Sequence, residues 1–121
     1  VQVGAHTPPP FYEVPIHIRQ FCDDLAERLR HEPGVTVQSA SQFLAWVDWR
    51  FQWIHPFKDF NGRIGRVLLA ALLYKLALPH VETAPSDPHA RKRYLDALRA
   101  ADTQGLDQLE VLWLRRLEGA L

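Results

Sequence analysis

The segment from residue 55 to residue 66, which reads HPFKDFNGRIGR, brings together side chains that suit chemistry on phosphate groups. His55 carries an imidazole, the side chain best able to accept a proton near neutral pH. Asp59 offers the kind of carboxylate that holds Mg²⁺ beside substrate phosphates. Arg63 and Arg66 are three residues apart on a predicted helix, so they share a face, and guanidinium groups pair well with phosphate oxygens. These residue types at this spacing predict a phosphate-binding site with a base and a metal-binding carboxylate.

The pair Asn61-Gly62 predicts the start of a helix within this segment, with Asn61 as its cap. Free N–H groups at a helix start form an anion-binding site, and the helix dipole adds to the attraction. Arg63 and Arg66 oppose that dipole, so this end of the helix should need a compensating anion. A polyphosphate would supply one.

Each of these residues also has a structural explanation when it is taken alone. His55 could cap helix carbonyls, and Asp59 could be a turn residue. Arg63 and Arg66 could form surface salt bridges. Their joint spacing favours the functional interpretation, whereas the run Arg91-Lys92-Arg93 is interpreted as a solvated helix face.

Five helices are predicted from prolines, glycines and the spacing of apolar residues. They run from Pro15 to Arg30, from a cap at Ser39 or Ser41 to about Ile54, from Gly62 to about Ala77, from Pro88 to about Asp102, and from about Asp107 through Leu117. The second helix carries Trp46, Trp49 and Trp53 beside another apolar stripe, so we expect it to be the central helix and these tryptophans to lie in the core. Residues 1–4 alternate like a short strand. The chain is therefore predicted to be an all-α domain with one additional strand.

Length and composition limit the classes of protein to which the chain can belong. Its 121 residues suit one domain, and 47% hydrophobic and 23% charged residues are ordinary for a globular protein. The 14 basic residues balance 14 acidic residues, which gives no support for a general nucleic-acid binder. A single cysteine, Cys22, excludes an internal disulfide and favours a reducing compartment. Because the chain contains no methionine, we expect a trimmed or processed form whose upstream part is missing.

The segment HPFKDFNGRIGR resembles the signature of the Fic domain family, H-x-F-x-(D/E)-G-N-G-R-x-x-R. The matching positions are His55, Phe57, Asp59, Asn61, Gly62, Arg63 and Arg66. Residues 4–14, GAHTPPPFYEV, resemble the segment that leaves the family's β-hairpin flap. Residues 76–79 and 94–109 also follow the family's usual layout.

The resemblance implies that residues 1–121 form a single Fic core domain, an all-α helical bundle of Fic type with a short β flap near the N-terminus. Within it, residues 1–10 would be the remnant of the flap, and residues 55–66 would be the active-site loop and helix start. The flap would align a segment of a target protein by β-pairing.

The activity implied by the resemblance is Mg²⁺-dependent transfer of AMP from ATP to a hydroxyl side chain of a target protein. His55 would be the general base, and Asp59 would hold Mg²⁺ on the α- and β-phosphates. The resemblance assigns the anion hole to Asn61, Gly62 and Arg63, the γ-phosphate end to Arg66, and an inward-pointing anchor of the loop to Phe57. We expect a bacterial, cytoplasmic nucleotidyltransferase with no membrane partner and no direct contact with nucleic acid.

Phe60 departs from the family pattern, which has glycine at this position. If the backbone there requires a positive φ, a phenylalanine is strained, and its ring could obstruct the nucleotide. Two alternatives therefore stay open: a catalytically weak module that binds nucleotide or protein, and an enzyme that removes AMP or transfers another phosphate-containing group. Gly62 argues against transfer of the terminal phosphate, because the Doc-type branch carries lysine there.

Many Fic proteins are inhibited by a helix bearing (S/T)-x-x-x-E-(G/N), whose glutamate pairs with the second arginine of the signature. No Ser or Thr of this chain has a glutamate four residues later. The nearest match, Glu118-Gly119, has Leu114 in the Ser/Thr position. We therefore expect the inhibitory helix to come from the missing N-terminal part or from a separate chain, which leaves Arg66 free to bind phosphate.

Overall fold

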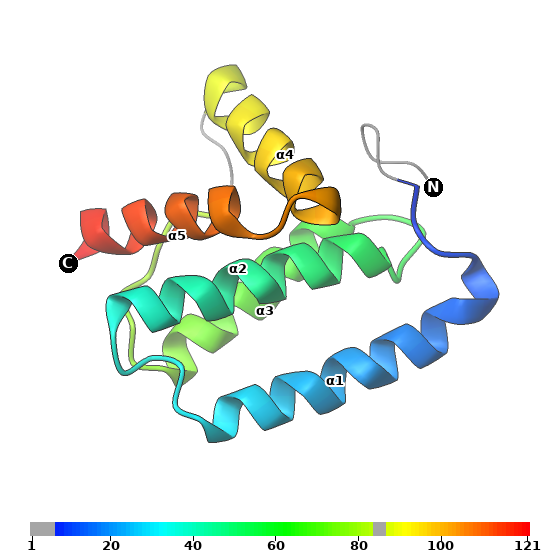
Figure 1. Ribbon diagram of the computed structural model, residues 1–121, viewed down its shortest axis with the longest axis horizontal. Helices are drawn as coiled ribbons and strands as arrows, with labels where there is room; N and C mark the ends of the chain where they lie inside the picture. Colours follow the sequence, from blue (N-terminus) through cyan, green and yellow to red (C-terminus); the bar gives the residue numbers. More distant parts are fainter. Residues whose placement is uncertain (1–6, 84–86) are drawn as a thin grey trace.

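The computed structural model describes residues 7–83 and 87–121, and in these ranges it contains five α-helices and a short 3-10 helix (Figure 1). The elements are η1 (Phe11–Glu13), α1 (Val14–Arg30), α2 (Val37–Ile54), α3 (Asn61–Lys75), α4 (Pro88–Thr103) and α5 (Asp107–Ala120). The all-α fold predicted from the sequence is confirmed. The strand expected at residues 1–4 lies outside the described residues.

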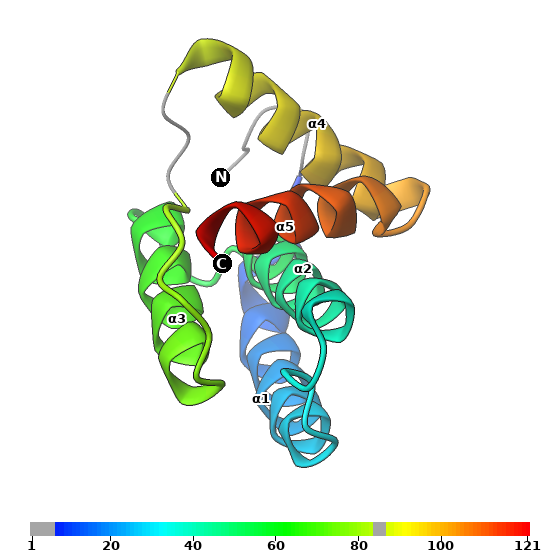
Figure 2. The ribbon, with the colours of Figure 1, turned by 90° about the vertical axis from the view of Figure 1, so that its left-hand side faces the viewer.

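Helix α2 is the centre of the fold. Helices α1, α3 and α5 all pack against it, and α4 packs mainly against α5 (Figures 1 and 2). Leu44, Val47 and Ile54 of α2 are completely buried. Gly65 brings α3 close to α2, because a Cβ at this position would lie 3.2 Å from the ring of Phe51. The two helices that bear the residue 55–66 segment are therefore held together in the core.

The start of α2 differs from the prediction of a cap at Ser39 or Ser41. Thr36 is the N-cap, and its hydroxyl oxygen accepts a hydrogen bond from the Ser39 N–H at 2.9 Å. The Ser39 hydroxyl oxygen accepts one from the Thr36 N–H at 3.2 Å in return, which completes a capping box. The prediction was wrong by one turn because Ser39 occupies the third helical position, where it supports the cap instead of forming it.

The tryptophans of α2 are divided between the core and a cavity. Trp46 is buried, as predicted, in contact with Phe21 and Phe43. Trp49 and Trp53 are only partly buried: they pack against the core and also line a cavity. The expectation that all three lie in the core is therefore confirmed for Trp46, whereas Trp49 and Trp53 lie at the edge of the core, where the cavity begins.

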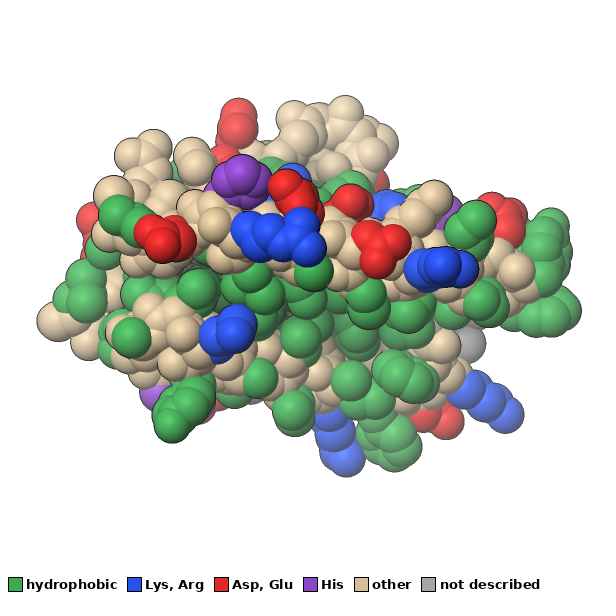
Figure 3. All heavy atoms as spheres, turned by 90° about the horizontal axis from the view of Figure 1, so that it is seen from below, with side chains coloured by type: hydrophobic (Ala, Val, Ile, Leu, Met, Phe, Trp, Pro, Cys, Tyr) green, Lys and Arg blue, Asp and Glu red, His purple; other side chains and the backbone are tan. Residues whose placement is uncertain are grey.

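The outer side of α3 is unusually apolar for a solvent-exposed helix face. Ile64, Val67 and Tyr74 are exposed there, Tyr74 by 89%. Seen from the side on which α1 and α3 lie, hydrophobic side chains form a band across the molecule beside a row of charged ones (Figure 3). None of the described helices is long and apolar enough to span a membrane.

Candidate active site

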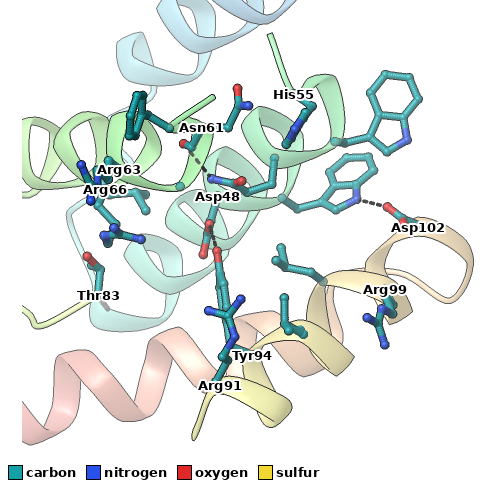
Figure 4. Close-up of a pocket in the computed structure, with 18 of the residues that line it drawn as sticks. Asp48, His55, Asn61, Arg63, Arg66, Thr83, Arg91, Tyr94, Arg99 and Asp102 are labelled. Carbon is teal, nitrogen blue, oxygen red and sulfur yellow. Dashed lines mark hydrogen bonds between the residues drawn. The ribbon is translucent and has the colours of Figure 1, made fainter. Parts of the chain in front are cut away.

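A cavity of about 400 Å³ lies between the end of α2, the start of α3 and one side of α4 (Figure 4). Most of the signature residues line one wall of this cavity. The opposite wall is formed by α4, which is more than twenty residues away along the chain. The signature segment and α4 together therefore define the candidate site.

His55 ends α2 and lines the cavity. Its N–H still donates to the Phe51 carbonyl at 3.1 Å, but its backbone is left-handed, with φ 51° and ψ 59°. The following residue, Pro56, disfavours a right-handed helical conformation at His55, which explains why the helix stops here. The imidazole is thus carried by the last turn of a buried helix.

The side chain of Asn61 anchors the loop between α2 and α3. Its Oδ1 accepts a hydrogen bond from the Phe57 N–H at 2.9 Å, and its Nδ2 donates one to the Phe57 carbonyl at 2.7 Å. Asn61 is 4% exposed and is the first residue of α3, whereas Phe60 is the N-cap. The predicted capping role of Asn61 is therefore replaced by a bridge across the loop.

Phe57 does not anchor the loop through its ring. The residue is 48% exposed, which contradicts the expectation that it points into the core. Its backbone N–H and carbonyl are both held by the Asn61 side chain, so the loop is fixed without burial of the ring. The anchor is the amide–backbone pair and not an aromatic side chain.

Phe60 adopts the left-handed conformation, with φ 65° and ψ 21°. A phenylalanine in this region costs on the order of 1–3 kcal/mol, whereas glycine would not be strained. Its carbonyl accepts the Ile64 N–H at 3.0 Å, the first hydrogen bond of α3. The Arg63 guanidinium lies 4.9 Å from the centroid of the Phe60 ring, a distance typical of a cation–π contact.

The start of α3 offers three backbone N–H groups to an anion. Because the first helical bond comes from Ile64, the N–H groups of Asn61, Gly62 and Arg63 have no acceptor within the helix. A Cβ at Gly62 would lie 3.2 Å from Nη1 of Arg66, so the glycine leaves room for that guanidinium beside the helix start. Arg63 and Arg66 both line the cavity.

Asp59 is an exposed carboxylate that lines the cavity next to this helix start. Within residues 7–83 and 87–121, no group of three His, Cys, Asp or Glu side chains could hold a metal ion by itself. Mg²⁺ commonly binds one or two carboxylates together with substrate phosphates. One carboxylate beside an anion site fits that manner of binding.

The floor of the cavity contains a buried carboxylate, that of Asp48, which is 2% exposed. Its Oδ1 accepts a hydrogen bond from the Tyr94 hydroxyl at 2.7 Å, and its Oδ2 accepts one from Nε1 of Trp113 at 3.1 Å. Burial raises the pKa of the Asp48 carboxyl, although these two hydrogen bonds act in the opposite direction. Burial also raises the pKa of the Tyr94 hydroxyl well above its ordinary value. This network joins α2 to both α4 and α5.

Part of the cavity lining is apolar and aromatic. Trp49 and Trp53 contribute to it from α2, and Leu95 and Leu98 contribute to it from α4. Nε1 of Trp49 donates to Oδ1 of Asp102 at 2.8 Å, a second hydrogen bond between α2 and α4. None of these residues was predicted to belong to the site, and Trp49 and Trp53 were expected in the core. The signal present in the sequence is the spacing of residues 91, 95, 98 and 102, which puts them on one face of a helix.

Comparison with known proteins decides the family. The model of the Fic/DOC family matches residues 1–73, which is more than half of the chain. The chain belongs to the Fic/DOC family. It is 36% identical over 106 residues to a probable protein adenylyltransferase of Aquifex aeolicus, covering 88% of this chain and 29% of that protein. It is 30% identical over 102 residues to the protein adenylyltransferase Fic of Nematostella vectensis, covering 84% of this chain and 23% of that protein.

A third relative is a protein of Dictyostelium discoideum. The chain is 32% identical over 78 residues to a Fido domain-containing protein of Dictyostelium discoideum, covering 64% of this chain and 52% of that protein. The chain spans less than a third of the length of the two adenylyltransferases. The match therefore concerns a Fic domain within longer relatives.

The structure brings most of the Fic signature residues to one place. Those that line the cavity are His55, Asp59, Asn61, Gly62, Arg63 and Arg66. Of the predicted site residues, Phe57 is outside this lining. Phe60, the departure from the Fic signature, lies at the cavity with a largely exposed ring.

Proposed function

We propose that this chain transfers AMP from ATP to a hydroxyl side chain of a target protein. The observation that carries the proposal is the convergence of an imidazole, a carboxylate and a helix N-terminus with two arginines on one cavity of about 400 Å³. Two relatives that match most of this chain are named protein adenylyltransferases, which supports the same reaction class.

The start of α3 would bind the phosphates. The N–H groups of Asn61, Gly62 and Arg63 would surround phosphate oxygens, and the helix dipole would favour their negative charge. Arg66 would pair with the terminal phosphate through its guanidinium. Arg63, which also contacts Phe60, would contribute positive charge at the mouth of this site.

Asp59 would hold Mg²⁺ together with the phosphates, since the chain supplies one carboxylate at this place and the nucleotide would supply the remaining charged ligands. When bound, the ion would neutralise negative charge on the phosphates. Asp59 itself would orient the bound nucleotide relative to α3.

His55 would act as the general base. Its imidazole would take the proton from the hydroxyl of the target, and the oxygen would form a bond to the α-phosphorus of ATP. The bond between this phosphorus and the oxygen bridging to the β-phosphate would break, and pyrophosphate would leave with the electron pair. The base of the nucleotide would lie on the apolar wall, where Trp49, Trp53 and Leu98 offer flat and apolar surface.

Incubation with α-labelled ATP and with γ-labelled ATP in parallel, in a cell extract that supplies targets, tests the reaction. Relative to extract without the chain, whose own kinases use the γ-phosphate, we expect the added chain to increase protein-bound α label and not protein-bound γ label. An increase in γ label would indicate phosphoryl transfer, and no increase in either label would favour a module that binds without turnover.

The variant His55→Ala tests the assigned base in the same assay. We expect transfer to fall by about 10²–10⁴-fold, because a positioned base contributes that much to a rate. ATP affinity and the free energy of unfolding should change little, since the imidazole lies at the end of a helix. His31→Ala is the matched control, because His31 also follows the last turn of a helix but is exposed and does not line the cavity. Transfer by His55→Ala at the rate of the control would refute the mechanism.

A binding module with weak or no turnover is the second candidate, and Phe60 is the observation that favours it. The strained backbone and the contact between its ring and Arg63 alter the part of the signature that would hold phosphate. If the chain is such a module, His55→Ala should bind ATP as the wild type does, and the wild-type chain should give no labelled protein.

A further inference from the structure

Arg91 is a basic side chain on the wall of the cavity that faces the Fic signature. It lies in the first turns of α4, whose start is fixed by Pro88 and by the Asp87 side chain, which accepts the Ala90 N–H at 2.7 Å. Figure 4 shows Arg66 and Arg91 reaching toward the same space, one from α3 and the other from α4. Positive charge therefore flanks the predicted phosphate site from two helices.

The neighbours of Arg91 are placed differently. Lys92 forms an ion pair with Asp96 on the outer side of α4, with Nζ 2.7 Å from Oδ2. Arg93 does not belong to the cavity lining that the structure describes. Arg91 is exposed, as the interpretation of this run as a solvated face predicts, but it also lines the cavity, on the side of α4 that carries Leu95 and Leu98.

The hydrogen bond between Tyr94 and Asp48 fixes the part of α4 that carries Arg91. Arg91 and Tyr94 are three residues apart, so they lie on the same side of the helix, one turn from each other. The Tyr94 hydroxyl donates to Oδ1 of Asp48 at 2.7 Å, and Asp48 is itself held on α2, in the core of the fold. Arg116 adds support from α5, with its guanidinium 5.7 Å from the centroid of the Tyr94 ring.

We propose that Arg91 is a third phosphate-binding residue of this site and that Tyr94 and Asp48 are the residues that position it. A polyphosphate bound at the start of α3 would have one side against that helix and the other side, which points toward α4, without a basic partner from α3. Arg91 reaches that side from α4, and its guanidinium can form charge-assisted hydrogen bonds to phosphate oxygens. The inference rests on the proposed function, because the anion is taken to be the polyphosphate of ATP.

Affinities of Arg91→Ala for ATP and for adenosine, with the whole chain, test the first half of the proposal. We expect ATP affinity to fall about tenfold, the effect of losing one hydrogen bond to a charged group, and adenosine affinity to stay unchanged. Arg91→Lys should restore part of the loss, because it keeps the charge but not the planar pair of donors. Arg93→Ala is the matched control and should bind ATP as the wild type does.

The outcomes separate this inference from the function on which it rests. If the wild type binds ATP and Arg91→Ala binds it equally well, Arg91 is not a phosphate ligand, and the proposed function stands. If the wild type binds no ATP, the proposed function fails first. Equal losses for ATP and adenosine would also overturn the inference, because adenosine has no phosphate.

One tyrosine variant and one tryptophan variant test whether Tyr94 positions Arg91. Tyr94→Phe and Trp113→Phe each remove one hydrogen bond to Asp48, but only the first removes a bond from α4. We expect Tyr94→Phe to lower ATP affinity severalfold in the wild type and to have almost no further effect when Arg91 is already alanine. Trp113→Phe should lower the free energy of unfolding with little effect on ATP affinity. Equal losses of ATP affinity in both single variants, or additive losses in the double variant, would show that Tyr94 does not act through Arg91.

Discussion

Phe60 shows how one residue can depart from a signature while the local backbone stays the same. The position requires a left-handed conformation, with φ 65°, which is why glycine suits it in the family pattern. The chain accepts the strain and gains a contact between the ring and the Arg63 guanidinium at 4.9 Å. The ring also contributes to the lining of the cavity. The backbone strain lowers the stability of the loop and the contact with Arg63 raises it, so a substitution at Phe60 can measure which effect is larger.

Phe60→Gly should leave transfer activity equal to the wild type or raise it, because the change relieves the strain and widens the mouth of the phosphate site. Stability should change by no more than about 1 kcal/mol, since the flexibility of glycine in the unfolded chain offsets the relief. Phe57→Gly is the matched control, a half-exposed phenylalanine in the same loop whose φ is not positive. A clear loss of activity in Phe60→Gly alone would show that the ring is a positive contact for substrate.

Arg66→Ala should weaken binding of ATP more than binding of AMP, because this guanidinium is proposed to meet only the terminal phosphate. A loss of about tenfold for ATP corresponds to one hydrogen bond to a charged group. The exposed Arg115→Ala on α5, outside the cavity lining, is the control. Titration of each variant with both nucleotides is the measurement, and equal losses for ATP and AMP would remove Arg66 from the γ-phosphate.

At the scale of the elements, the helices could be predicted because their signals are local. Helix α4 begins at Pro88 as expected, and the end of α2 before Pro56 follows from the restricted conformation of a residue that precedes a proline. The half of the cavity that is proposed to bind phosphate could be predicted for the same reason, since it lies within one loop and one helix start.

The other half of the site could not be predicted, because it depends on contacts between distant residues. Tyr94 meets Asp48 across 46 positions, and Trp49 meets Asp102 across 53. An alternating or helical pattern shows which side of α4 is apolar, but not which helix that side approaches. The error at Phe57 has a similar origin, because an aromatic residue in a signature was assumed to be buried while an asparagine side chain holds the loop.

Asp48→Asn tests how the buried carboxylate that joins these helices affects the free energy of unfolding at different pH values. Since burial raises the pKa of Asp48, the folded protein keeps this proton to a higher pH than the unfolded chain, in which an aspartate has a pKa of about 3.9. Its contribution to stability is fully present below the unfolded value and is lost as the pH rises through the raised folded value. We therefore expect the free energy of unfolding of the wild type, minus that of Asp48→Asn, to fall as the pH rises above about 4, the unfolded-state pKa of an aspartate. Asp23→Asn, at an exposed site on α1, is the control, and a difference that is flat or rises with pH would contradict the expectation.

At the scale of the whole molecule, α2 serves both the core and the site. Its buried face contacts α1, α3 and α5, while its last turn and its partly exposed tryptophans contribute to the cavity (Figure 2). The start of α3 and the wall formed by α4 are thus both positioned by contacts with α2. If ATP binds in this cavity as proposed, a carboxylate that paired with Arg66 would compete with its phosphates.

Glu118→Gly tests whether α5 could supply that carboxylate. Glu118 is exposed near the end of α5 and does not line the cavity, and no ion pair joins Arg66 to a carboxylate among the residues that the structure describes. We expect the ATP affinity of Glu118→Gly to equal that of the wild type, because Arg66 is already open to phosphate. Glu118→Gln is the companion variant, since it removes the charge without adding a flexible residue to the last turn of the helix. Isothermal titration of the three proteins with ATP is the measurement, and a gain of about tenfold or more in both variants would show that α5 is inhibitory after all.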